Sequence, residues 1–165
     1  MLFETERLYV AKWEEGDLDS LYGLFNDTAI KEFILPKLTM EETECIFEKQ
    51  LHAYENNYPF GRYFIVEKIS NDFIGLLLLR KNKEEGGVEI GYSLIREHWK
   101  KGYATEIVQE GVNWLFEQKK ISNIYAVTET GNLNSQNVLL KCGFCREENL
   151  MEEEPMEINF TLLRD

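Results

Sequence analysis

A short basic stretch, Lys100-Lys101-Gly102, stands between an alternating apolar segment and a segment with helical periodicity. The first amides of an α-helix have no partner inside the helix and carry partial positive charge, so a helix start binds phosphate readily. The two lysines add charge, and a glycine lets the backbone approach a phosphate closely. The stretch therefore predicts a phosphate-binding loop, for which a solvated basic turn is the alternative. It matches neither the P-loop nor the Rossmann glycine pattern.

Two elements must position this loop. Residues 88–95 alternate between apolar and polar side chains, which is typical of a half-buried strand. One face of this strand carries Val88, Ile90, Tyr92 and Leu94, and the other carries Glu89, Gly91 and Ser93. Residues 104–119 carry an apolar stripe at helical spacing, and we expect Leu115 and Phe116 of that stripe to be buried against the sheet.

The remaining segments also alternate between strand and helix patterns. Strands are predicted over residues 8–13, 62–68, 73–80, 124–128 and 157–163, and helices after Asp17, after Thr39 and over residues 135–142. Asp17 is expected to cap its helix. Thr39 and Glu42 form a capping box, and Gly143 fits the left-handed position that follows a helix. The pattern predicts one layered α/β domain over residues 1–165.

Composition excludes several classes of function. The formal net charge is −12, which argues against a nucleic-acid partner, because a phosphate backbone requires a basic face. The charge fits attraction of a cationic substrate, or simply solubility. No apolar run is long enough to cross a membrane, and the chain opens with Glu4, Glu6 and Arg7 rather than with a signal peptide. We therefore expect a cytoplasmic protein that does not bind membranes.

The cysteines Cys142 and Cys145 form a C-x-x-C pair, but a zinc site would need two more ligands. The two histidines, His52 and His98, are distant in sequence. A redox C-x-x-C pair opens a helix, whereas Cys142 is expected to close one. The pattern favours structural thiols and predicts no metal.

Five short segments in a fixed order resemble one family. Residues 89–92 read E-I-G-Y and residues 99–106 read W-K-K-G-Y-A-T-E. Residues 132–135 read N-L-N-S with K-C-G-F at 141–144, and T-E-R-L stands at 5–8. This set resembles the GNAT superfamily of N-acetyltransferases, in its RimJ/RimL-type branch, over nearly the whole chain.

The resemblance implies a mixed, mostly antiparallel α/β (α+β) sheet, flanked by helices. The sheet splays between its fourth and fifth strands, which here are residues 88–95 and 124–128, and acetyl-CoA lies in the opening. The implied pantetheine contacts are the backbone of Ser93, Leu94 and Ile95 and the side chain of Asn132. The implied pyrophosphate contacts are the amides of Lys100, Lys101, Gly102, Tyr103, Ala104 and Thr105. Ser135 is implied to lie near the sulfur.

Two positions depart from the family pattern. Lys100 replaces a glycine of the branch, and if this position requires a positive φ, lysine costs about 1 kcal/mol relative to glycine. Leu139 replaces the tyrosine that many relatives use as a general acid, and it cannot donate a proton.

Other groups must therefore carry out the proton transfers that the reaction requires. An amine attacks a thioester only as the free base, and a carboxylate acting through water could remove its proton. Glu89 is the first candidate for this base and Glu129 the second, with a solvated or salt-bridged carboxylate as the alternative for each. Ser135 could donate to the departing thiolate, or it could only cap a helix. His98 is interpreted as a solvated residue.

The sequence thus predicts transfer of an acetyl group from acetyl-CoA to a primary amine, by direct attack in a ternary complex. The acceptor is a protein N-terminal α-amine or a small-molecule amine. A polyamine or aminoglycoside N-acetyltransferase and a non-catalytic acyl-CoA-binding domain are the alternatives. A monomer and a homodimer both remain open.

Overall fold

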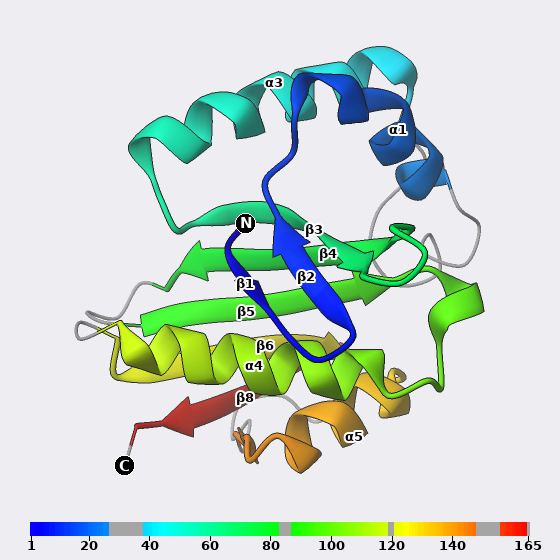
Figure 1. The fold of residues 1–165 in the computed structure, drawn as a ribbon. Helices are drawn as coiled ribbons and strands as arrows, with labels where there is room; N and C mark the ends of the chain where they lie inside the picture. Colours follow the sequence, from blue (N-terminus) through cyan, green and yellow to red (C-terminus); the bar gives the residue numbers. More distant parts are fainter. Residues whose placement is uncertain (27–37, 83–86, 119–120, 148–155, 165) are drawn as a thin grey trace.

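The computed structural model describes residues 1–26, 38–82, 87–118, 121–147 and 156–164 (Figure 1). The strands of this part are β1 (Phe3–Glu4), β2 (Leu8–Ala11), β3 (Gly61–Glu67), β4 (Phe73–Lys81), β5 (Gly87–Leu94), β6 (Asn123–Glu129), β7 (Cys145–Arg146) and β8 (Glu157–Leu163). The helices are η1 (Glu15–Asp17), α1 (Leu18–Asn26), α3 (Met40–Asn56), η2 (Arg96–His98), α4 (Tyr103–Glu117) and α5 (Leu133–Lys141). None of these helices is long and apolar enough to span a membrane.

The strands form one mixed sheet that opens in the middle. Among the described residues its order is β1-β2-β3-β4-β5-β6-β8-β7, and every neighbouring pair is antiparallel except β5 with β6. That parallel pair is short, joining Gly87–Glu89 to Asn123–Tyr125. Beyond Glu89 the two strands separate, so the predicted splay and the predicted α/β fold class are both confirmed.

Helices cover the sheet as its side-chain alternation requires. Figure 1 shows α4 lying along β5 and β6, α5 below it, and α3 beyond β3. Gly111 lets α4 approach the sheet, because a Cβ at this position would stand 2.9 Å from Cδ1 of Ile90. The face of β5 that carries Ile90 therefore packs on α4, and the face that carries Glu89 and Gly91 points the other way.

The apolar stripe of α4 is buried as predicted, with one exception. Leu115 is fully buried, but Phe116 is only partly buried at the edge of the core. The prediction that Phe116 is buried was wrong because neighbouring helical positions lie about 100° apart, so only one of the two can face the centre of the sheet.

Leu115→Ala should lower the free energy of unfolding by about 2–5 kcal/mol, because it leaves a cavity in a closed core. Phe116→Ala should cost less than Leu115→Ala, since part of its ring already contacts water. Urea titrations of both variants would measure this order. Equal or reversed losses would show that α4 is rotated relative to this packing.

Several local predictions can be compared with the structure. Thr39 caps α3 and forms a capping box with Glu42, and Gly143 has a φ of +88°, as predicted. Asp17 does not cap α1; its carboxylate instead accepts a hydrogen bond from the amide of Glu14 at the start of η1. The short strands β1 and β7 were not predicted, because two residues carry no periodicity.

Candidate active site

A cavity of about 790 Å³ lies where β5 and β6 separate. It is lined by Tyr92, Ser93, Leu94, His98, Trp99, Lys100, Gly102, Tyr103, Ala104, Thr105, Gly131, Asn132, Leu133, Asn134, Ser135, Asn137, Val138 and Lys141. These described lining residues include two lysines and no carboxylate, although the chain carries a net charge of −12. The local charge therefore favours an anionic ligand.

The loop between η2 and α4 presents its backbone amides to this cavity. Gly102 caps α4 with a φ of +83°, and Lys100 has a φ of 59°. Lys100 does have a positive φ, so the cost of about 1 kcal/mol relative to glycine applies at this position. Successive amides in such left-handed turns form a concave anion site. The first amides of α4 extend this site, because they lack partners inside the helix.

The turn between β1 and β2 holds the loop from outside. Arg7 donates from Nη1 to the carbonyl oxygen of Lys101 at 3.1 Å. The same guanidinium forms an ion pair with Glu106, with Nη2 and Oε2 2.5 Å apart. Burial raises the pKa of Glu106, but hydrogen bonds from Thr5 and Arg7 and the charge of Arg7 outweigh it and leave the pKa below its ordinary value. Glu106 therefore stays ionised and keeps Arg7 in place.

Two further bonds fix the ends of the loop. The indole Nε1 of Trp99 donates to the carbonyl oxygen of Leu94 at 2.6 Å. The hydroxyl of Tyr103 donates to the carboxylate of Glu67 on β3. The loop is thus tied to β5, β3 and the β1–β2 turn, so its amides are arranged before any ligand arrives.

The open edge of β5 differs from the predicted one. The amide of Ile95 donates to Ile74 at 2.9 Å, and a Cβ at Gly75 would collide with the carbonyl oxygen of Ser93. The backbone groups of Ser93 and Ile95 therefore point toward β4. Because direction alternates along a strand, the backbone of Tyr92 and Leu94 faces the opening instead. Of the predicted trio only Leu94 lies on the open edge, and its carbonyl oxygen is already bonded to Trp99.

Ser135 lies in the first turn of α5 and does not cap it. Asn132 is the capping residue, since its Oδ1 accepts from the amide of Ser135 at 3.1 Å. The Ser135 hydroxyl is left to accept a hydrogen bond from the hydroxyl of Tyr92, 3.3 Å away. Burial raises the pKa of Tyr92 to about 12, so its hydroxyl remains protonated at neutral pH. Ser135 and Tyr92 thus form a pair of hydroxyls on the cavity wall.

Sequence reasoning missed Tyr92. The residue was assigned to the apolar face of its strand, and that is where it lies, but the face continues past the point where α4 covers it. Tyr92 could have been identified because it lies on a strand that borders the predicted splay. A buried phenol normally has a hydrogen-bond partner, so a polar contact was to be expected there.

Other predicted residues lie outside the cavity lining. Glu89 points to the opposite face of the sheet, where Arg80 binds it with Nη2 and Oε2 2.7 Å apart. Glu129 is exposed at the end of β6, and Lys101 and Ile95 do not line the cavity. Leu139 is buried in the core. His98 does line the cavity, with a buried Nδ1 that has no partner within the described chain.

The cysteines are free thiols. Cys142 is buried and ends α5 as predicted, and Cys145 is exposed. Within the part of the chain that the structure describes, no group of three or more His, Cys, Asp or Glu side chains could hold a metal ion.

The family described as the acetyltransferase (GNAT) domain matches residues 7–145. This chain belongs to the GNAT acetyltransferase family. The match begins at Arg7, at the end of the β1–β2 turn, and includes the loop before α4 and the whole of α5. It includes every element that borders the cavity, and the GNAT family uses acetyl-CoA.

Known GNAT proteins resemble this one over nearly their full length. YjdG of Bacillus subtilis, an uncharacterised N-acetyltransferase, is 36% identical over 151 residues, which is 87% of this chain and 89% of that protein. RimL, a ribosomal α-N-protein acetyltransferase solved with coenzyme A, superposes with a TM-score of 0.82 at 16% identity, covering 98% and 97% of the two chains. The spermidine N-acetyltransferase of Vibrio cholerae, solved with CoA and spermine, gives a TM-score of 0.78 at 22% identity, covering 95% of each chain.

The cavity has the groups that a coenzyme A pyrophosphate requires. Amides at a helix start, two left-handed residues and a lysine suit its negative charge. The open edge of β5 offers backbone groups to an extended arm, as a neighbouring strand would. The residues present therefore fit acetyl-CoA.

Proposed function

We propose that this GNAT acetyltransferase transfers the acetyl group of acetyl-CoA to a primary amine by direct attack within a ternary complex. The observation that carries the proposal is the Tyr92–Ser135 hydroxyl pair, which lies on the wall of a cavity whose loop amides suit a pyrophosphate. Binding and hydrogen-bond donation are thereby combined in one opening of the sheet.

The binding roles follow from position. The amides of Lys100 and of Gly102 to Thr105 hold the pyrophosphate, with the Lys100 side chain adding charge. The backbone of Leu94 and Tyr92 pairs with the pantetheine arm. Asn132 serves as cap through Oδ1, and its amide nitrogen, which has no partner among the described residues, remains able to donate to that arm.

A thiolate must leave when the amine–carbonyl bond forms and the carbon–sulfur bond breaks. A simple thiol has a pKa near 8.5, so its thiolate requires only a modest proton donor. Ser135 donates a hydrogen bond to the leaving sulfur, while Tyr92 donates to Ser135 and keeps its own proton, so the thiolate takes its proton from water. Tyr92 thus provides the phenol that Leu139 cannot provide.

The amine must also lose a proton. Glu89 lies on the opposite face of β5 from Tyr92, next to the point where the strands separate, and it accepts this proton through water. Arg80 holds this carboxylate in an ion pair, with Nη2 and Oε2 2.7 Å apart. Deprotonation at pH 7 costs about 1 kcal/mol for an α-amine and about 4–5 kcal/mol for a lysine-like amine. The smaller cost favours an α-amine as the acceptor.

A polyamine is the second candidate acceptor. The net charge of −12 favours attraction of a polycation, and a solved relative in fold holds spermine. The two classes differ in the pKa of the attacking amine and in the charge of the remaining molecule.

An acceptor screen with acetyl-CoA, following free thiol release, tests the function. We expect turnover with at least one class among peptides with a free N-terminus, polyamines and aminoglycosides, with peptides the fastest. If CoA binds but no member of the panel reacts, the protein is an acyl-CoA-binding domain and the proposed reaction is wrong.

A further inference from the structure

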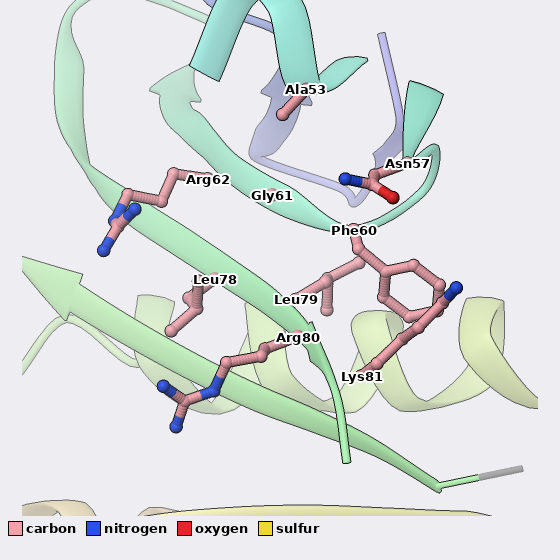
Figure 2. Close-up of a pocket in the computed structure, with 9 residues that line it drawn as sticks. All are labelled: Ala53, Asn57, Phe60, Gly61, Arg62, Leu78, Leu79, Arg80 and Lys81. Carbon is pink, nitrogen blue, oxygen red and sulfur yellow. The ribbon is translucent and has the colours of Figure 1, made fainter. Parts of the chain in front are cut away.

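A second cavity, of about 340 Å³, lies on the opposite side of β4 from the splay. The end of α3 and the strands β3 and β4 line it, as Figure 2 shows. Its wall carries three cations, Arg62, Arg80 and Lys81. The guanidinium groups of Arg62 and Arg80 lie at one end with Leu78 between them, and the Lys81 ammonium lies beside Phe60 at the other.

Arg62 is the unusual member of this group. Its backbone amide donates to Oε1 of Gln50 at 3.0 Å, but no carboxylate pairs with its guanidinium among residues 1–26, 38–82, 87–118, 121–147 and 156–164. Burial lowers the pKa of Arg62, and the neighbouring charge of Arg80 lowers it further. Glu89 compensates the charge of Arg80 through their ion pair, so Arg62 is the half-buried cation left without an anion among the described residues.

A second donor near the cavity also lacks a partner. Gln50 is 6% exposed, and its buried Nε2 has no hydrogen-bond partner within the described chain. This atom lies against Gly61, which lines the cavity, and a Cβ at Gly61 would collide with it. Buried donors are normally satisfied, but this atom is closed to solvent and Gln50 does not line the cavity, so Arg62 is the donor that faces a ligand.

Strand register places Arg62 and Arg80 on the face from which an amine would approach. Arg62 pairs with Leu78, and Leu78 pairs with Gly91 of β5, so all three share one face of the sheet. Gly91 lies just beyond the last paired residue of β5 and β6. With strands about 4.8 Å apart, Arg62 lies about 10 Å from the start of the opening.

We propose that this cavity binds a negatively charged group of the acceptor, a carboxylate or a phosphate, while its amine lies at the opening of the sheet. The inference rests on the proposed function, because it uses the opening as the place of reaction. It defines the acceptor as an amine with an anion about 10 Å away, as in a peptide with a free N-terminus and an acidic second residue. A polyamine would meet Arg62, Arg80 and Lys81 as like charges.

Matched acceptors test this directly. In the wild type, kcat/KM for Ala-Glu-amide and Ala-phosphoserine-amide should exceed that for Ala-Gln-amide by about 10- to 100-fold, as expected for a charge-assisted hydrogen bond. Arg62→Gln should remove this preference while leaving Ala-Gln-amide unchanged. Arg62→Lys should retain part of it, because lysine keeps the charge without the planar fork. Arg164→Gln, which removes the same charge from an exposed position directly after β8, should leave the preference intact.

A measurement without turnover separates this inference from the proposed function. Glutarate should raise the melting temperature of the wild type above that in sodium chloride of equal ionic strength, and Arg62→Gln should abolish this difference. If glutarate acts equally on both proteins or on neither, or if the wild type uses Ala-Gln-amide as well as Ala-Glu-amide, the anion site is wrong. If glutarate acts as expected but no amine reacts, the anion site stands and the proposed reaction fails.

Discussion

Gly102→Val should lower the affinity for CoA on the order of 10²-fold, which corresponds to nearly 3 kcal/mol. Gly102 has a φ of +83°, a conformation that a β-branched residue avoids. Space is not the obstacle, because the nearest atom to an added Cβ is Nη2 of Arg7 at 3.5 Å. Valine would turn the backbone out of this conformation, and the amides at the start of α4 would move with it. Calorimetric titration with CoA measures the loss.

Lys100→Gly is the matched control for this variant. Lys100 also has a positive φ, of 59°, and glycine accepts that conformation without strain. The loop keeps its shape and loses one charge, so CoA affinity should fall less than tenfold. A folded Gly102→Val protein that binds CoA as the wild type does would exclude this loop as the pyrophosphate site.

Tyr92→Phe and Ser135→Ala should each lower the turnover number about 10²-fold and change CoA affinity little, because both weaken the hydrogen bonding to the leaving thiolate. Since the two hydroxyls act in series, the double variant should be little worse than either single one. Steady-state rates and CoA titrations of the three proteins test this. Tyr9→Phe, which removes an exposed hydroxyl bonded to Asn71, is the control.

The pH dependence of the turnover number is an independent test of the protonation state of Tyr92. Its pKa is raised to about 12, so the phenol keeps its proton well above the ordinary value of 10, and the turnover number should show no loss from this group below about pH 10. A loss with a midpoint near pH 8 that disappears in Tyr92→Phe would contradict this protonation state. Full activity of both single variants would remove the hydroxyl pair from the mechanism.

The sequence predicted best those features that depend only on neighbouring residues, such as helix caps. The capping box at Thr39 and the left-handed Gly143 each follow from the residue type and its immediate neighbours. The splay between β5 and β6 was given by the family resemblance, and the register confirms it.

The wrong predictions concern features that depend on how strands far apart in the sequence pair with each other. The orientation of the Ser93 and Ile95 backbone depends on how β5 pairs with β4, which no local pattern contains. The ion pair of Glu89 with Arg80 depends on the same register. Ser135 was considered as a helix cap because serine often caps, but Asn132 three residues earlier takes that place.

The contact of Arg7 with Lys101 and Glu106 makes the first residues of the chain part of the support for the proposed coenzyme site. Figure 1 shows the β1–β2 turn beside the start of α4, so the loop between β5 and α4 is supported by a segment about 95 residues away in sequence. Local opening of β1 and β2 would release that support and weaken binding to the loop, so a ligand bound to the loop must oppose the opening by the same free energy. Fraying of the N-terminus and release of coenzyme A are therefore thermodynamically coupled.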